Sequence, residues 1–238
     1  MVSLFLFSLL LGTSAGALVV QSHWSHVRLK SIPPARVDGR EGGEVILYCS
    51  ATGSPAPHIA WYKDSMFVSH LDWRVEEEIS SMGESVARLI IPCLSQSDVG
   101  KYECRARSGE HEVSATTELN VVPNDDPKAG HCSESGLPQI SMWRRTYMAE
   151  EGDTAVLPCR VQNDASDYKF TWSNADGGNP GAGNDVRYSL LENGDLVIRE
   201  TRFSDMGQYT CTVTGPAGSD TVHTFFYPLA PERNMINK

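Results

Sequence analysis

One pattern of cysteine, tryptophan, glycine and tyrosine occurs twice in this sequence. The first copy consists of Gly43-Glu-Val-Ile-Leu-Tyr-Cys49, Ile59-Ala-Trp61 and Asp98-Val-Gly-Lys-Tyr-Glu-Cys104. The second copy consists of Gly152-Asp-Thr-Ala-Val-Leu-Pro-Cys159, Phe170-Thr-Trp172 and Asp205-Met-Gly-Gln-Tyr-Thr-Cys211. The spacings between the landmarks are nearly equal in the two copies. A chain of 238 residues has room for two domains of about 100 residues each, so the repeat indicates two domains of one kind.

Short runs of alternating apolar and polar residues lie between these landmarks, separated by polar turns rich in glycine and proline. Examples are Glu44 to Ser50, Ala87 to Ile91, Asp195 to Arg199 and Asp220 to Phe226. Such runs without helical periodicity indicate an all-β sandwich. In an immunoglobulin sandwich two cysteines bridge the sheets, a tryptophan packs on the bridge, and a tyrosine closes a corner. We therefore predict two tandem immunoglobulin-like β-sandwich domains of the I-set type.

This fold gives most of the prominent residues a structural role. The framework pairs Cys49 with Cys104 and Cys159 with Cys211. In such domains an arginine at the start of strand D commonly meets the aspartate that precedes the corner tyrosine, so we expect Arg74 to meet Asp98 and Arg187 to meet Asp205. The residues expected to be framework are Trp61, Trp172, Tyr102, Tyr209, Asp98 and Asp205.

The N-terminal 17 residues, Met1 to Ala17, lack charged side chains and end in the small-residue pattern Ala15-Gly16-Ala17. We interpret them as a signal peptide, because the apolar run is too short to cross a bilayer; the alternative is a buried N-terminal segment. The chain is then expected to be secreted and extracellular. The predicted organisation is a signal peptide (1–17), domain 1 (18–123), a linker (124–137), domain 2 (138–228) and a tail (229–238).

The composition and motifs argue against nucleic-acid binding and catalysis. The chain has 20 basic and 30 acidic residues, a net charge of −10, and a negative surface repels phosphate backbones. No nucleophile elbow, zinc-protease helix or P-loop motif is present. The acidic run Glu76 to Glu78 is more typical of a solvated strand than of a cation site, and His23 and His26 flank an N-terminal tryptophan without further ligands. We expect no enzyme, no metal and no cofactor.

Binding to another protein remains, and the start of domain 2 offers candidate contacts. In the run Ile140-Ser-Met-Trp-Arg-Arg-Thr-Tyr-Met148, an inward Ile140 would leave Trp143 pointing outward by the period of two. An exposed tryptophan beside arginines suits an interface, so Met142, Trp143 and Tyr147 are candidate ligand contacts. The alternative is that Trp143 packs at the domain junction. Phe225 and Phe226 must face opposite sides of their strand, which leaves one of them available to a partner.

A family resemblance follows from domain 2 and from the extra cysteines. The relevant segments are Leu191-Glu-Asn-Gly-Asp-Leu-Val-Ile198, Ser204 to Cys211, Thr224-Phe-Phe-Tyr-Pro228, Ile91-Pro-Cys93 and Gly130-His-Cys132. Together they resemble the secreted two-immunoglobulin-domain proteins of moulting animals, whose branches are the insect ecdysone-inducible neural/ectodermal development factor and the nematode zwei-Ig proteins.

The resemblance implies two functions that differ by branch. The insect branch implies an extracellular antagonist that sequesters insulin-like peptides, which requires affinity and no catalytic group. The nematode branch implies a secreted neuronal or adhesion factor that maintains axon and cell positions through contacts with cell-surface or matrix proteins. A homo-oligomer is compatible with either function.

Two cysteines remain once the framework bridges are assigned. Strand E of domain 1 is expected to end near Cys93, at the same pole as the start of the linker that carries Cys132. A disulfide needs a Cα separation of roughly 4.4–6.8 Å, which a short excursion of the linker would provide. We predict a Cys93–Cys132 bridge that ties the linker to domain 1, with a bridge between two protomers as the alternative.

Overall fold

The computed structural model describes residues 25–68, 81–124, 137–162, 167–181 and 185–230. Domain 1 contains β1 (His26–Ser31), β2 (Arg36–Arg40), β3 (Val45–Ser54), β4 (His58–Lys63), β5 (Met66–Phe67), β6 (Met82–Ile91), the 3₁₀ turn η1 (Gln96–Asp98), β7 (Gly100–Ser108) and β8 (His111–Val122). Domain 2 contains β9 (Ile140–Glu150), β10 (Ala155–Leu157), β11 (Cys159–Val161), β12 (Lys169–Asn174), β13 (Tyr188–Leu190), β14 (Leu196–Ile198), η2 (Phe203–Asp205), β15 (Gly207–Gly215) and β16 (Gly218–Leu229). The signal-peptide prediction concerns residues outside the described part.

Domain 1 is a sandwich of two sheets. One sheet has the order β1-β3-β6 and the other β2-β8-β7-β4-β5. The residues that alternate inward from both sheets form one core around the Cys49–Cys104 disulfide and Trp61. The indole of Trp61 is buried there, as expected for a tryptophan packed on an inter-sheet bridge.

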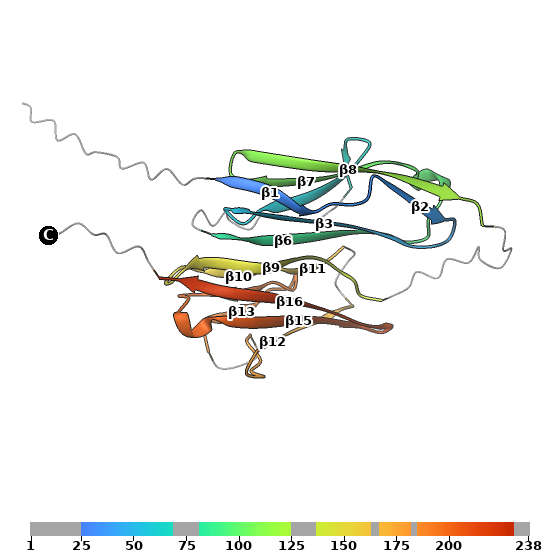
Figure 1. The fold of residues 1–238 in the computed structure, drawn as a ribbon. Coiled ribbons are helices and arrows are strands. Elements are labelled where there is room, and N and C mark those ends of the chain that lie inside the picture. The colour runs from blue at the N-terminus through green and yellow to red at the C-terminus, as the bar shows by residue number, and fades with distance from the viewer. Residues whose placement is uncertain (1–24, 69–80, 125–136, 163–166, 182–184, 231–238) are drawn as a thin grey trace, which may run out of the picture.

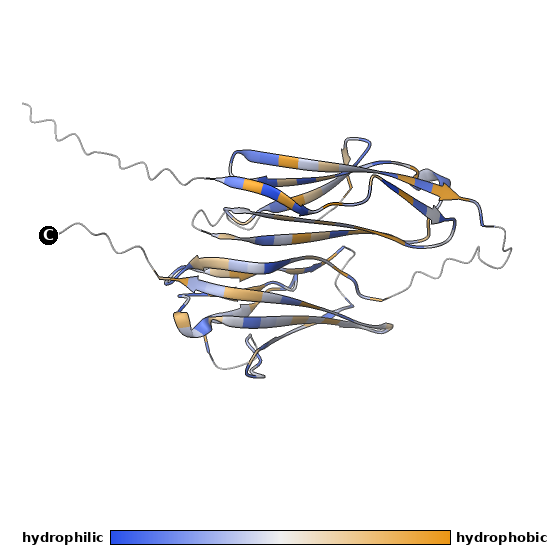
Figure 2. Ribbon diagram, in the orientation of Figure 1, coloured by the Kyte–Doolittle hydropathy of each residue, from blue (hydrophilic) through white to orange (hydrophobic). Residues whose placement is uncertain are grey.

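Domain 2 repeats the arrangement around the Cys159–Cys211 disulfide and Trp172. Its small sheet has the order β10-β14-β13, and its larger sheet runs β9-β16-β15-β12 with β11 paired to β9. Apolar and polar residues alternate along the strands of both domains (Figure 2), which gives each strand one face for the core and one for the surface. The predicted fold of two immunoglobulin-like sandwiches is confirmed.

The motif residues have the structural roles that the sequence indicates. The hydroxyl groups of Tyr102 and Tyr209 each donate a hydrogen bond of 2.9 Å to the backbone carbonyl four residues earlier, which closes the tyrosine corner. Arg187 Nη1 lies 2.7 Å from the Asp205 carboxylate, as predicted. Arg74 lies outside the described residues, so its pairing with Asp98 stays a prediction.

The pKa of Asp205 reflects this framework role. Burial by itself would raise the pKa of the carboxyl, but hydrogen bonds from the Arg187 guanidinium, the Arg202 backbone and the Tyr188 hydroxyl outweigh it. They hold the pKa of Asp205 below its ordinary value. In domain 1, burial together with the charges of Asp98 and Asp64 raises the pKa of Tyr102 to about 12. These groups are therefore fixed parts of the fold with one charge state at neutral pH.

The two domains share a sheet. Strand β6 of domain 1 pairs antiparallel with β9 of domain 2, with Met82 opposite Met148 and Ala87 opposite Met142. We call this pairing the seam. It joins the strands into one sheet with the order β1-β3-β6-β9-β16-β15-β12, and Figure 1 shows β6 and β9 lying side by side between the two sandwiches. The domains are therefore packed along their length rather than end to end.

Candidate functional site: the open face of the shared sheet

The first half of strand β9, residues 140–144, is buried on both faces, which corrects the prediction of an exposed tryptophan. Trp143 is only 6% exposed and packs edge-on against Tyr48 of domain 1, with ring centroids 6.5 Å apart. Met142 and Tyr147 are buried as well. The physical reason is that β9 contributes to the domain 2 core while a strand of domain 1 covers its other edge. Trp143 therefore packs at the domain junction, which was the alternative, and these three side chains form no free surface.

Polar side chains add contacts between the two domains beyond the pairing of β6 with β9. The guanidinium of Arg88 on β6 lies 4.5 Å from the Trp143 ring and 3.1 Å from the Asp220 carboxylate of domain 2. The side-chain amide of Gln162 accepts a hydrogen bond from the Ile90 N–H (2.9 Å) and donates one to the Ile90 carbonyl (2.8 Å). An amide side chain thus continues the ladder on the edge of β6 where the strand pairing has ended.

One surface of the shared sheet extends across both domains, and we call it the open face. Residues opposite each other in paired strands point to the same side of a sheet. The registers place one row of such residues across six strands: Arg28, Thr52, Glu84, Thr146, Phe225 and Gln208. The row passes through the seam without interruption. A partner placed on this face would therefore contact both domains at once.

Apolar side chains gather on the open face along the seam. Met82, Met148 and Tyr227 form the row next to the one described above. Phe225 is 46% exposed whereas its neighbour Phe226 is fully buried, which confirms that one of the two remains available. Phe203 of η2 packs edge-on against Tyr227 at a centroid distance of 6.3 Å and is exposed. These residues form an exposed apolar strip.

A charged cluster lies beside the apolar strip. The Glu84 carboxylate is only 3% exposed and contacts Lys30 Nζ at 2.8 Å through one oxygen and Arg145 Nη1 at 2.6 Å through the other. Arg145 also donates a hydrogen bond of 2.5 Å to the Tyr48 hydroxyl. Lys30 belongs to β1 of domain 1 and Arg145 to β9 of domain 2, so the buried glutamate fixes the positions of cations from both domains.

The domain 2 part of the open face carries hydroxyl groups and a histidine. Thr212 and Thr221 share a hydrogen bond of 3.1 Å between their hydroxyls, and the Thr210 hydroxyl lies 3.0 Å from His223 Nδ1. The face is therefore cationic near β1, apolar along the seam and hydroxyl-rich toward β12. This face does not follow from the sequence because its composition depends on the β6–β9 register; the available signal was the run of apolar residues on both faces of the first half of β9.

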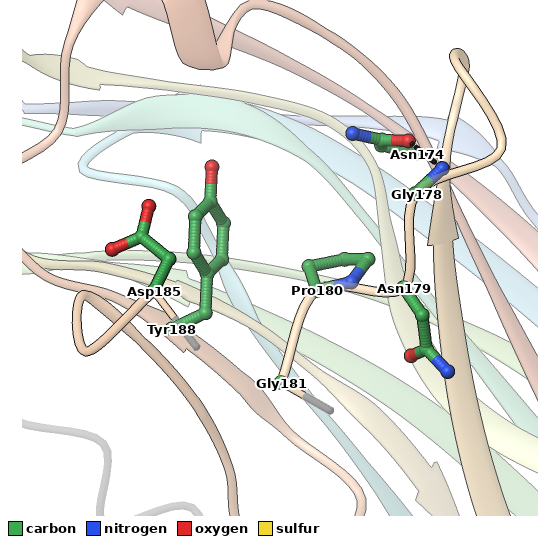
Figure 3. A pocket seen from close by; sticks show the side chains of 7 residues that line it. All are labelled: Asn174, Gly178, Asn179, Pro180, Gly181, Asp185 and Tyr188. Atoms are coloured by element: carbon green, nitrogen blue, oxygen red, sulfur yellow. Dashed lines mark hydrogen bonds between the residues drawn. The ribbon is translucent and has the colours of Figure 1, made fainter. Parts of the chain in front are cut away.

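A small pocket occurs elsewhere, between the turn that follows β12 and the segment that leads into β13 (Figure 3). Its polar groups already serve the fold. The side-chain oxygen of Asn174 accepts a hydrogen bond from the Gly178 N–H, and the Asp185 carboxylate lies 3.1 Å from Arg187. The Tyr188 hydroxyl, in turn, donates to Asp205. These contacts indicate a structured loop rather than a reactive site.

The described residues supply no arrangement suited to metal chemistry. Within the five described ranges, no group of three or more His, Cys, Asp or Glu side chains is placed to hold a metal ion. The segment Glu76 to Glu78 and His23 lie outside those ranges. No helix in the described part combines the length and the apolar character needed to cross a membrane.

Cys93 lies in the turn that follows β6, with a backbone φ of 51°. Its predicted partner Cys132 is outside the described residues, so the third bridge stays a prediction. The two framework disulfides are present, with Cα separations of 6.5 and 6.4 Å. These values lie within the range that a disulfide requires.

Comparison with known protein families agrees with the two-domain fold. Residues 30–121 match the immunoglobulin I-set domain, and residues 138–214 match the immunoglobulin domain. Receptor-type tyrosine-protein phosphatase F of Mus musculus is 32% identical over 186 residues, but the match covers 78% of this chain and only 9% of that protein. The similarity to that receptor is therefore limited to a short part of it.

Two relatives match over most of their length. Zwei Ig domain protein zig-4 of Caenorhabditis elegans is 26% identical over 222 residues, covering 89% of this chain and 84% of zig-4. Neural/ectodermal development factor IMP-L2 of Drosophila melanogaster is 27% identical over 217 residues, covering 87% and 79%. The crystal structure of IMP-L2 matches this fold with a TM-score of 0.73 at 28% identity, covering 88% of this chain and 97% of that one. The chain therefore belongs to the immunoglobulin superfamily, in the two-domain family that includes the zwei Ig proteins and IMP-L2.

Proposed function

We propose that this protein is a secreted, non-enzymatic binding protein that captures insulin-like peptides on the open face and withholds them from their receptor. The proposal begins from the resemblance to the insect branch of the family. The match to IMP-L2 supports it, because that match extends over both domains at a TM-score of 0.73. Secretion is proposed from the charge-free N-terminal 17 residues, and sequencing the N-terminus of protein from the culture medium tests it.

The observation that carries the proposal is the continuity of the open face through the seam. Phe225 and Tyr227 of domain 2 lie in the same rows as Thr146 and Met148 of β9, which lie next to Glu84 and Met82 of domain 1. Interfaces commonly combine an apolar centre with a polar rim, and aromatic side chains supply much of the binding energy. The open face has this composition.

The rigidity of the shared sheet also favours binding. Association costs free energy for every group that must be ordered. Hydrogen bonds of the strand ladder and the Gln162 and Arg88 contacts already fix the two domains relative to each other. A hormone would therefore meet a preformed surface, and affinity alone would lower the free hormone concentration by mass action.

Isothermal titration calorimetry with human insulin and insulin-like growth factor 1 tests the proposal. We expect the mature protein to bind at least one of these peptides with a Kd below 1 µM, corresponding to about −8 kcal/mol or better. Phe225→Ala should weaken the binding at least tenfold. The matched control is Met66→Ala, which removes a more exposed apolar side chain from the other sheet of domain 1 and should leave the Kd unchanged.

Two outcomes would contradict the proposal. The absence of binding heat for both peptides at micromolar concentrations would reject insulin-like peptides as ligands. An equal loss of affinity in Phe225→Ala and Met66→Ala, with both variants folded by circular dichroism, would show that the open face is not where the hormone binds.

A second candidate function is the adhesive or neuronal role implied by the nematode branch. A separate group on the opposite sheet of domain 1 favours it: the Arg105 guanidinium lies 4.1 Å from the Tyr62 ring, Phe67 packs edge-on against Tyr62, and Met66 beside them is exposed. An aromatic and arginine group of this kind suits a contact with a cell-surface protein. Binding of the protein to neuronal cell surfaces, lost in Met66→Asp, would support this role.

A further inference from the structure

The edge strand β1 presents only basic side chains on the open face. Its exposed residues His26, Arg28 and Lys30 alternate with the less exposed Val27, Leu29 and Ser31, and Val27 and Leu29 pack against the core of domain 1. The register places His26 opposite Ser54 and Arg28 opposite Thr52 on the neighbouring strand, and Lys30 reaches Glu84. All three therefore lie on the same side of the sheet as the apolar strip.

The charge that this part of the open face offers to a partner is positive. Lys30 and Arg145 are 52% and 46% exposed, whereas the carboxylate that joins them, Glu84, is 3% exposed. Each oxygen of Glu84 is already occupied by one of the two cations. Arg28 adds a further exposed charge in the same row. One buried anion thus positions cations whose outer sides remain available.

This local charge is opposite to the net charge of −10 of the whole chain. At physiological ionic strength the Debye length is about 8 Å, so charges farther away are largely screened. The nearest cations then decide which groups bind at this end of the open face, while the acidic remainder of the surface contributes little. This end of the open face therefore attracts negatively charged groups, which the acidic remainder of the surface repels.

We propose that the open face recognises an amphipathic segment of its protein ligand, with acidic side chains against Arg28, Lys30 and Arg145 and apolar side chains against the strip at the seam. The inference rests on the proposed function and specifies its ligand chemistry. Neighbouring strands lie about 4.8 Å apart, and β16 carries Phe225 and Tyr227 of the apolar strip. In the sheet order, Arg145 on β9 lies about one strand spacing from β16, and Arg28 on β1 lies about four spacings from it. The acidic groups of the ligand would therefore span about 5–20 Å from its apolar contacts.

The test uses two synthetic amphipathic peptides with identical apolar positions, one with glutamate and one with lysine at the polar positions, followed by fluorescence anisotropy. We expect the full mature protein to bind the glutamate peptide more tightly. Arg28→Glu should weaken this binding about tenfold, and raising the salt from 50 to 300 mM should weaken it in the unmodified protein. Because rim charges act mainly on association, most of the change should appear in the association rate.

Matched variants separate a local effect from a change in net charge. Lys101→Glu makes the same charge change at an exposed position of β7, on the other sheet of domain 1, and should leave the affinity for the glutamate peptide unchanged. Lys30→Gln provides a second variant that retains a hydrogen-bond donor toward Glu84 and should weaken binding severalfold. Tighter binding of the lysine peptide, or equal effects of Arg28→Glu and Lys101→Glu, would overturn the inference.

The outcome is also distinguishable from that of the proposed function. If insulin-family peptides bind and Arg28→Glu has no effect on either them or the glutamate peptide, the hormone proposal stands and this inference fails. If the glutamate peptide binds with the expected variant pattern and no insulin-family peptide does, this inference stands and the hormone proposal fails.

Discussion

Removing Arg88 tests whether the seam holds the domains together. This side chain belongs to domain 1, but it contacts three groups of domain 2: the Trp143 ring at 4.5 Å, the Asp220 carboxylate at 3.1 Å and the Ile140 carbonyl at 3.5 Å. A cation–π contact contributes about 0.5–2 kcal/mol, and a partly exposed ion pair about 0.2–1 kcal/mol. We therefore expect Arg88→Ala to reduce the free energy of unfolding by about 2 kcal/mol.

The chain supplies a matched control in Arg105. Its guanidinium lies 4.1 Å from the Tyr62 ring and 2.8 Å from Glu103, so Arg105→Ala removes a stacked ring and an ion pair within domain 1 alone. Both variants should lose similar stability in urea. Only Arg88→Ala should weaken the coupling between the domains, because only its contacts cross the seam.

Differential scanning calorimetry and small-angle X-ray scattering distinguish the two variants. The unmodified protein should unfold in one transition, and Arg88→Ala should separate it into two and raise the radius of gyration. Arg105→Ala should shift the single transition without dividing it. If Arg88→Ala leaves stability within about 0.5 kcal/mol of the unmodified protein, or if both variants divide the transition equally, the assignment of Arg88 as a domain clamp is wrong.

Three further predictions follow from other contacts. Gly83→Ala would place a Cβ atom 2.3 Å from a backbone carbonyl oxygen of β9, so the seam should lose roughly 1–3 kcal/mol, measured as a lower urea midpoint; an unchanged midpoint would contradict the register. Asp205→Asn removes the buried carboxylate that pairs with Arg187 and leaves the guanidinium only the exposed carboxylate of Asp185, so it should cost about 3 kcal/mol at neutral pH. Because the folded pKa of Asp205 is lowered, this difference should be complete above about pH 4 and vanish as the pH falls through the folded pKa; a difference that persists in acid would argue for a packing effect. Non-reducing peptide mapping should recover Cys93 and Cys132 in one linked pair, whereas two free thiols would refute the bridge.

The sequence predicted each domain because the relevant residues act locally within one sandwich. A cysteine pair, a tryptophan and a corner tyrosine have fixed mutual positions in this fold, so Trp61 and Trp172 could be placed without a structure. The opposite orientations of Phe225 and Phe226 followed from the period of two along a strand. These inferences concern single strands and their own cores.

The arrangement of the domains could not be derived in the same way. Pairing of β6 with β9 depends on a register between strands far apart in the chain. A shift of one residue would move every side chain of the strand to the opposite face of the sheet. The error at Trp143 came from treating β9 as a strand with one solvent face. The apolar residues on both faces of its first half are typical of a segment buried on both sides, which was the available signal.

The seam also affects the tendency of the protein to aggregate. A strand at the edge of a sheet exposes unpaired N–H and C=O groups that can pair with another molecule. The β6–β9 pairing covers two such edges, so in the described part the shared sheet ends at β1 and β12. Separation of the domains would expose both long strands together, and two opened molecules could then exchange their β9 strands. Conditions that open the seam at high protein concentration are therefore expected to produce strand-exchanged dimers and aggregates before either domain unfolds.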